Sequence, residues 1–405
     1  MDQVQIERSN LLWRRCLRVL LVAAFLTAGS ATTATAAVPR TSTAPRHTVG
    51  FDGLVYTSAQ VGDTVYVGGS FRNAIVNGKQ VARKRLAAVD TRTGDLLPWA
   101  PATDGTVFAL AAAGSSVYAT GKFTTVGGQS RPGLAGINLT TGAVGPLRHT
   151  IGGSGKVLAA GGGRLYLGGE FTSVDGKPER NLAAFKLSDA TLDTGFRGTA
   201  DGMVQSLAAA GSRLYVGGKF KRLNSAGTPR LGALRMSDGQ LDPSFRPATP
   251  YSVLALSITA DRVYAGLAGV GGRVVSYRPD GAMEWSSVTD GDIQAIAYLN
   301  GAVYAGGHFT VACPERSRTA TSWCPAKLRP QPKVAVWDAA SGKLLDWNPH
   351  SNGRWGVLTM AANTSLKVVT LGGEFTAFGD HSRPRFAQFS ACAYGCGGRP
   401  AQRAG

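Results

Sequence analysis

The sequence has few charged residues and no long apolar segment beyond its N-terminal region. Only 17% of the 405 residues are charged, so the chain is not a solvated acidic or basic tail. No segment after residue 37 approaches the roughly 18 uninterrupted apolar residues of a membrane-spanning helix. We therefore expect no membrane span in the chain that follows this region.

Sequence motifs of common enzymes are absent as well. The five His residues are far apart, so the metalloprotease motif H-E-x-x-H is missing, and neither G-x-S-x-G nor a P-loop occurs. Gly-rich runs such as 161–163 lack the G-x-G-x-x-G order of dinucleotide-binding loops. Without a C-x-x-C pair or closely spaced His residues, a zinc site is not expected. The sequence predicts no metal and no cofactor, and an enzyme is the less favoured class.

Glycine and proline are abundant instead. The chain has 54 Gly and 19 Pro, which are poor residues for helix interiors, and this excludes a coiled coil or an all-helical bundle. Apolar residues make up 43% of the chain, which argues against a disordered protein. The net charge of +18 favours anionic partners.

Residues 1–37 have the order of a secretory signal peptide. Four Arg residues between positions 8 and 18 precede the apolar run 19–28, and small residues follow at 34–37. The apolar run is short for a membrane anchor, which is the alternative interpretation. We therefore expect a secreted, extracellular protein with a main domain over 38–391 and a C-terminal tail over 392–405.

The cysteines fit export. Cys16 leaves with the signal peptide, and an even number remains, as is typical of disulfides in exported proteins. Of the three possible connectivities, the favoured one pairs Cys313 with Cys324 and Cys392 with Cys396.

One short motif recurs along the mature chain. It has the form Val-Tyr-x-Gly-Gly-x-Phe, with substitutions, at 65–71, 117–123, 165–171, 214–220, 263–267, 303–309 and 369–375. Each copy lies in a unit of four short apolar stretches separated by Gly-containing turns, with an Ala-rich first stretch and an aromatic residue in the fourth. Four strands in roughly 50 residues are typical of a propeller blade.

The seven units predict an all-β fold, a single seven-bladed β-propeller of four-stranded antiparallel blades. No segment between residues 50 and 390 has the pattern of a long helix. The seventh unit lacks a fourth strand, and an open blade edge invites aggregation. We therefore expect an N-terminal strand within residues 41–51 to close the ring.

The units resemble the delta-sixty propeller repeats of secreted bacterial proteins. The resemblance rests on the recurring motif, on the Leu-Ala-Ala-x-Asp stretch at 86–90 and on the stretch 241–247. It covers nearly all of the mature chain and implies a propeller fold. It implies no catalytic residues, because the family is largely uncharacterised.

Residues shared by most copies are interpreted as fold residues. The Gly-Gly pair lets backbone pass closely at a strand end, and the Tyr and Phe pack between blades. Asp104, Asp201 and Asp290 each precede a Gly before a first strand. We expect these three to form turns rather than to hold a metal.

Basic residues gather at one end of the expected ring. One directly precedes the third strand in five units, at Arg85, Arg230, Arg273, Lys333 and Arg385. Antiparallel alternation places these positions at the same end as the loops that join successive blades, which we call the loop face. Each cation either ties to a neighbouring blade or belongs to a ring of cations for an anionic ligand.

Departures from the repeat are the favoured binding positions, and the largest is an insertion at 310–332, expected on the loop face. The candidate binding residues are Arg316, Arg318, Trp323, Lys327, Arg329, Arg354, Trp355, Arg383, Arg385 and Arg85. Aromatic faces stack on sugars or bases, and cations hold phosphates or carboxylates. A plain solvated basic rim is the alternative.

The sequence therefore predicts a secreted, monomeric binding or scaffold module. Its expected partner is an acidic polysaccharide, a cell-wall polymer or extracellular nucleic acid. One alternative is a glycan hydrolase or lyase, with His350, His381 and Asp380, or Glu170 and Glu374, as acid–base candidates. Another is a structural module that docks a second protein through an exposed apolar patch.

Overall fold

The structure is a computed structural model that describes residues 40–317, 319 and 321–392. Every regular element among these residues is a β-strand. The described residues belong to one compact unit. Within them, no helix is long and apolar enough to cross a membrane. The predicted signal peptide, Arg318 and the Cys396 partner of Cys392 lie outside the described residues.

Seven sheets share one pattern, in which a middle strand pairs antiparallel with a first and a third strand. In chain order, sheets one to seven are built as follows: β3 (Val55–Val61), β4 (Thr64–Gly69) and β7 (Leu86–Asp90); β8 (Val107–Ala113), β9 (Ser116–Gly121) and β12 (Leu134–Asn138); β14 (Ile151–Gly161), β15 (Arg164–Val174) and β17 (Leu182–Lys186); β18 (Val204–Ala210), β19 (Arg213–Gly218) and β20 (Leu231–Arg235); β21 (Val253–Ile258), β22 (Val263–Leu267) and β23 (Arg273–Tyr277); β25 (Ile293–Leu299), β26 (Ala302–Gly307) and β29 (Val334–Asp338); β30 (Val357–Asn363), β31 (Val368–Gly373) and β34 (Phe386–Cys392).

Shorter strands extend some sheets or form hairpins in the loops. They are β1 (Arg40–Thr41), β2 (Gly50–Phe51), β5 (Asn73–Val76), β6 (Lys79–Ala82), β10 (Thr125–Val126), β11 (Gln129–Ser130), β13 (Val144–Arg148), β16 (Lys177–Pro178), β24 (Met283–Val288), β27 (Val311–Ala312), β28 (Arg329–Pro330), β32 (Ala377–Phe378) and β33 (His381–Ser382). Most of the hairpins lie between the second and third strands of a sheet, on the loop face.

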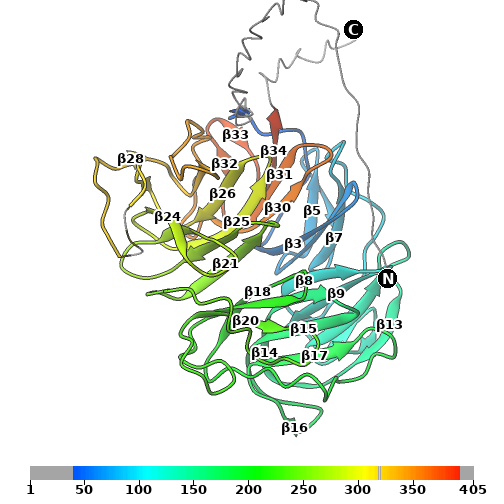
Figure 1. The fold of residues 1–405 in the computed structure, drawn as a ribbon. Helices are drawn as coiled ribbons and strands as arrows, with labels where there is room; N and C mark the ends of the chain where they lie inside the picture. Colours follow the sequence, from blue (N-terminus) through cyan, green and yellow to red (C-terminus); the bar gives the residue numbers. More distant parts are fainter. Residues whose placement is uncertain (1–39, 318, 320, 393–405) are drawn as a thin grey trace, which may run out of the picture. The chain divides into compact units, whose positions relative to one another are not determined.

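The first strands of the seven sheets lie side by side. Each of β3, β8, β14, β18, β21, β25 and β30 contacts the next, and β30 also contacts β3. In Figure 1 the orange end of the chain therefore lies beside its blue beginning. Sheets that are far apart in the sequence thus become neighbours.

Among the described residues, the fourth stretch of a unit forms a regular strand in two sheets. β13 completes sheet two and β24 completes sheet five. Elsewhere the fourth stretch makes a single bridge to the third strand, for example Val89 to Leu96 and Leu234 to Leu241. Pro98 and Pro243 follow these two bridges. Because proline cannot donate to a ladder, it shortens the strand.

The N-terminal segment pairs with the last sheet over a shorter range than expected. β1 pairs antiparallel with β34, and the amides of Ser42 and Arg46 donate to Ser390 O and Gln388 O at 3.0 and 2.7 Å. β2, by contrast, pairs with β5 of the neighbouring loop. Residues 47–51 run between sheets one and seven, because the Val49 amide donates to Gly94 O and the Phe51 amide to Pro384 O, at 3.2 and 2.9 Å.

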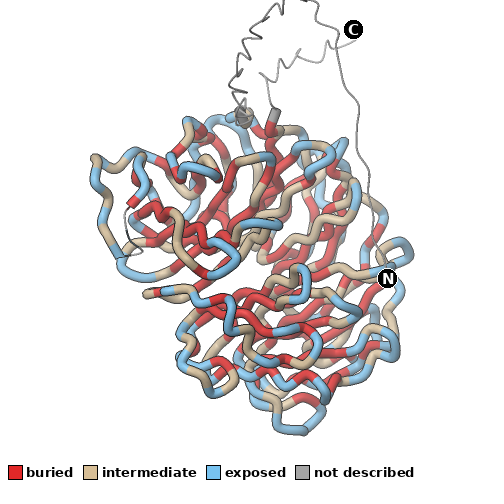
Figure 2. Tube along the Cα trace, viewed as in Figure 1, coloured by how far each residue is buried: buried red, intermediate tan, exposed pale blue. Residues whose placement is uncertain are grey.

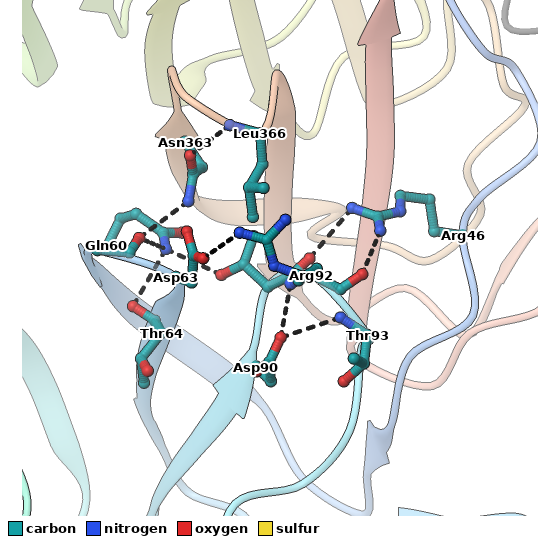
Figure 3. A network of polar contacts seen from close by, with 11 residues as sticks. Arg46, Gln60, Asp63, Thr64, Asp90, Arg92, Thr93, Asn363 and Leu366 are labelled. Atoms are coloured by element: carbon teal, nitrogen blue, oxygen red, sulfur yellow. Dashed lines mark hydrogen bonds and ion pairs between the residues drawn. The ribbon is translucent and has the colours of Figure 1, made fainter.

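Polar contacts join sheet one to this N-terminal segment and to sheet seven (Figure 3). The Arg46 guanidinium donates to Thr91 O at 3.1 Å and to Arg92 O at 2.5 Å. From sheet seven, Asn363 Nδ2 donates to Gly62 O at 2.9 Å. Carbonyl groups in the turns of sheet one thus accept hydrogen bonds from both ends of the described chain.

The apolar core lies between successive sheets (Figure 2). One buried cluster, for example, combines Tyr66 and Trp99 of sheet one with Leu110 and Val117 of sheet two. The Tyr66 hydroxyl also donates to Leu139 O, 2.8 Å away in the next sheet. Packing of the repeated Tyr between sheets, as the sequence predicts, is therefore found.

The repeated Gly-Gly pair allows two chain segments to pass closely. A Cβ at Gly307 would lie 1.9 Å from the carbonyl oxygen of Asp292, and one at Gly121 would lie 2.0 Å from that of Thr106. No side chain fits at such distances, so the predicted reason for this glycine is confirmed. Leu267 takes its place in the fifth sheet.

Candidate functional site

The Asp residues before the first strands tie loops together. Asp104 Oδ1 accepts hydrogen bonds from the amides of Thr124 and Thr125 at 2.8 and 2.9 Å, and its Oδ2 accepts one from Thr124 Oγ1. Asp201 and Asp290 accept equivalent amides in their own sheets. These carboxylates are therefore occupied by the second-to-third-strand loop, as the turn interpretation expects.

These hydrogen bonds change the acidity of Asp104. Burial raises the pKa of this carboxyl, but the hydrogen bonds from the Thr124 hydroxyl and from the amides of Thr125 and Thr124 outweigh that effect. Together they lower the pKa of Asp104 to about 2. The carboxylate stays ionised at neutral pH because its charged form is the better hydrogen-bond acceptor.

Two of the predicted cations before the third strand bind carbonyl groups. Arg85 Nη1 donates to Thr103 O of the next sheet at 2.7 Å, and Lys333 Nζ donates to His308 O at 3.2 Å. Both residues have left-handed backbone, with φ of 70° and 69°. The Arg85 guanidinium therefore connects two sheets through a hydrogen bond. Arg85 also lines a pocket on the loop face.

Arginines three residues before the third strand hold the outer part of a sheet. Arg83 donates to Leu97 O and Arg131 donates to Gly145 O, each at 2.8 Å. The candidate Arg383 donates in the same way to Arg46 O at 3.1 Å. The Arg383 guanidinium therefore binds the N-terminal segment. In sheets one and two, the equivalent arginine binds the fourth stretch of its own sheet.

The insertion at 310–332 lies along the outer strand of the preceding sheet. The amides of Cys313 and Ser317 donate to Val288 O and Ser286 O of β24, at 2.8 and 2.7 Å. Cys313 is bonded to Cys324, as the sequence predicts, with their Cα atoms 5.6 Å apart. The insertion covers the free edge of β24, whose backbone groups would otherwise face solvent.

A buried arginine fixes the tip of the insertion. Arg273 is 1% exposed, and its guanidinium donates to Ser322 O at 2.7 Å and to Thr321 O at 3.1 Å. Burial lowers the pKa of Arg273. This predicted loop-face cation is thus inside the protein, where it joins sheet five to the insertion.

A groove of about 1040 Å³ opens where the insertion meets sheets five and six. Trp323, which is 56% exposed, lines this groove. The charged residues along it are Arg316, Lys343, Glu284 and Glu315. Glu284 is paired with Arg262. Glu315 is therefore the one lining acid that forms no ion pair within the described residues, and the groove has two lining cations, Arg316 and Lys343.

The other candidate cations of the insertion are exposed. Arg329 Nη2 lies 3.3 Å from Asp346 Oδ1, an ion pair of two exposed groups that adds little stability. Lys327 is exposed at the edge of the loop. Neither residue lines the groove, so both belong to its basic surroundings.

The second exposed tryptophan lies elsewhere. Trp355 is 47% exposed; its amide donates to Glu374 Oε2 at 2.5 Å, and its ring centroid lies 6.1 Å from that of His308. The Arg354 guanidinium lies 5.3 Å from the Trp355 centroid. Trp323 contacts sheet five, whereas Trp355 contacts sheets six and seven, so the two do not form one aromatic platform.

The acid–base candidates of sheet seven lie on neighbouring segments, because the Gly379 amide donates to His350 O at 2.9 Å. His350 lies in a loop and His381 in β33, and both are exposed. His149, by contrast, is buried, with Nδ1 2.6 Å from Asp175 Oδ2 and Nε2 2.9 Å from Ala190 O. Both ring nitrogens are occupied, so this pair holds loops together. No group of three or more His, Cys, Asp and Glu in the described parts of the chain could hold a metal ion.

Sequence reasoning missed the groove residues that come from other segments. Lys343 lies in a turn of sheet six and Glu284 in β24, and neither departs from the repeat in a recognisable way. They meet Trp323 only because the insertion folds back on the neighbouring sheet. A covariation signal between these positions could have identified them.

Comparisons with known proteins agree on the fold. A family model described as a domain of unknown function (DUF5122) beta-propeller matches residues 163–196. The crystal structure of the WD40 beta propeller domain of Doa1 is similar with a TM-score of 0.53 and 13% identity, covering 87% of this chain and 96% of that one. A chain in the crystal structure of the mitotic checkpoint complex gives a TM-score of 0.56 and 13% identity, with 88% and 98% covered. No match is found among curated protein sequences. The fold of the described chain is therefore an all-β, propeller-type fold.

Proposed function

We propose that this chain is a secreted, seven-bladed propeller that binds an acidic polysaccharide through the insertion groove. The blade number is supported by the seven sheets of one pattern and by the contact of β30 with β3. Closure by the N-terminal segment is supported by the pairing of β1 with β34 and by the contact of Arg383 with Arg46. Secretion rests on the signal-like order of residues 1–37.

The observation that carries the binding proposal is the groove beside the disulfide-bonded insertion. It combines the exposed ring of Trp323 with the cations Arg316 and Lys343 in a space of about 1040 Å³. An aromatic face stacks on a sugar ring, and the cations pair with carboxylate or phosphate groups. The insertion is the largest departure from the repeat, so its residues are not needed for the blade pattern.

The lining favours a polysaccharide over nucleic acid. Glu315 lies among the groove residues, and a carboxylate accepts hydrogen bonds from sugar hydroxyls but repels closely spaced phosphates. Single-stranded nucleic acid is held by successive aromatic platforms, whereas Trp323 and Trp355 contact different sheets. A polymer whose sugars carry hydroxyl groups beside their carboxylates fits this arrangement best.

The proposal is tested by binding of the mature protein to polygalacturonate, with dextran and single-stranded DNA as the comparison polymers. At about 50 mM salt we expect binding to polygalacturonate and none to dextran, and at about 500 mM salt an affinity at least about tenfold lower, because exposed charges are screened. Substitution Trp323→Ala or Arg316→Ala is expected to weaken binding by about tenfold.

A matched control distinguishes binding in the groove from nonspecific attraction of the polymer to the positively charged protein. Lys186→Ala removes an exposed cation from β17 of sheet three and should leave polymer binding unchanged. Equal effects of Arg316→Ala and Lys186→Ala would contradict a groove site. So would salt-independent binding or a preference for DNA.

A further inference from the structure

Every first strand carries a β-bulge at the same position. The register of the first and second strands shifts at this position in all seven sheets, for example between Val55 and Thr57 and between Val107 and Ala109. Sheet three has a second shift, between Gly152 and Gly153. One residue is therefore extra in each first strand. The seven bulged residues are Tyr56, Phe108, Lys156, Gln205, Leu254, Gln294 and Leu358.

The bulge exposes this one position. All seven bulged residues are partly exposed, although the residue directly before each of them is buried. The preceding residues are also nearly uniform: Val in five sheets, Ile in one and Gly in one. A β-bulge turns a side chain out of the regular alternation and is often found next to active sites. The residue type at the bulge differs from sheet to sheet, whereas the backbone geometry stays the same. Such a position can determine ligand specificity in a repeat protein without changing the fold.

Bulged side chains of successive sheets touch one another. The Tyr56 and Phe108 rings meet edge to face with centroids 5.9 Å apart. The Lys156 ammonium lies 4.3 Å from the Phe108 centroid. These contacts show that the bulged side chains of three successive sheets lie next to one another, as expected where the first strands lie side by side.

The polar members of this set have unused hydrogen-bonding capacity. Gln205 Oε1 and Gln294 Oε1 are buried from solvent and have no hydrogen-bond partner within the described residues. Lys156 makes no ion pair with a described carboxylate, and the charged groups that act on it are Lys122 and Glu170. A buried acceptor without a donor is costly, so the two amides require a hydroxyl or water partner.

We propose that the seven bulged residues form a second ligand site, which takes a small hydroxylated carboxylate such as a uronic acid. Lys156 binds the carboxylate, while Gln205 and Gln294 accept hydrogen bonds from the hydroxyl groups. Tyr56, Phe108, Leu254 and Leu358 provide the apolar surroundings. The convergence of all seven positions relies on the closed ring of sheets proposed above, but the site shares no residue with the insertion groove.

Calorimetric titration of the mature protein tests this site with three probes. Galacturonate carries both the carboxylate and the hydroxyl groups, acetate carries only the carboxylate, and galactose only the hydroxyl groups. We expect galacturonate to bind at least about tenfold more tightly than either of the other two. Absence of galacturonate binding at about 10 mM, or equal binding of the three probes, would overturn the proposal.

Substitutions of single residues test the role proposed for each side chain in this second site. Lys156→Met should weaken galacturonate binding by at least about tenfold, and Lys156→Arg should restore most of it. Gln205→Leu should bring galacturonate down to the affinity of acetate. Lys186→Met in the same sheet is the matched control and should change nothing. If Lys156→Met resembles this control, the site is wrong, whereas unchanged polymer binding in Trp323→Ala would count only against the groove.

Discussion

At the scale of single residues, one hydrogen-bonding role is filled by different side chains in different sheets. Asp104 accepts two loop amides in sheet two, and Asn352 Oδ1 accepts the amides of Thr376 and Ala377 in sheet seven, at 2.7 and 3.0 Å. An acceptor oxygen is therefore required at this position, whereas a negative charge is not.

This difference predicts how Asp104 variants behave. Asp104→Ala should lower the free energy of unfolding by about 2 kcal/mol, because two amides and a hydroxyl lose their acceptor. Asp104→Asn should keep most of the stability, as Asn352 does in its own sheet. Urea unfolding of the two variants measures both values. Equal losses in the two variants would show that the charge itself is needed.

The pH dependence of Asp104 follows from its lowered pKa. The folded-state pKa of about 2 lies below the usual 3.8, so the ionised form stabilises the fold above about pH 3.8. That contribution disappears as the pH falls through about 2. Unfolding of Asp104→Asn should lack this component between these two pH values. An unchanged pH profile would contradict the assigned hydrogen bonds.

Sequence reasoning was successful for these residues because repetition marks them. The positions of Asp104 and Gly307 recur in most units, and a recurring residue in a repeat serves the common fold. The bulged positions of Tyr56 and Lys156 could not be recognised in this way, because their residue types differ from unit to unit. What they share is backbone geometry, which one sequence does not display.

At the scale of elements, the insertion protects an open strand edge. β24 offers backbone groups that pair with Cys313 and Ser317, and the Cys313–Cys324 bond holds the inserted segment in place. The spacing of the two Cys allowed the disulfide to be predicted. The docking on β24 was not predictable, because it depends on which edge lies near the insertion in three dimensions.

Loss of this disulfide should therefore affect both stability and solubility. The variant Cys313→Ser/Cys324→Ser should lose up to about 3 kcal/mol of unfolding free energy and should aggregate at lower temperature, because the β24 edge becomes accessible. Light scattering during heating measures the aggregation. Reductant should reproduce the effect in the unaltered protein and add nothing in the variant. Unchanged aggregation would mean that the edge is protected by other contacts.

At the scale of the whole molecule, the all-β, propeller-type class could be read from the repeat. Within the described part of the chain, the expected regular fourth strand is found only in sheets two and five, since residues such as Pro98 limit pairing. The N-terminal strand is shorter than expected because residues 50–51 pair with β5 of sheet one instead of with β34. Both differences arise from contacts between segments that are distant in the sequence.

The proposed closed ring depends on the N-terminal segment, and the proposed site of bulged residues depends on the ring. Hydrogen exchange at the amides of Ser42 and Arg46, which donate to Ser390 O and Gln388 O, tests this claim most directly. We predict that both amides are protected as strongly as the amides that join β31 to β34. Exchange of Ser42 and Arg46 at the rate of a free peptide, while sheet seven stays protected, would contradict closure by this segment.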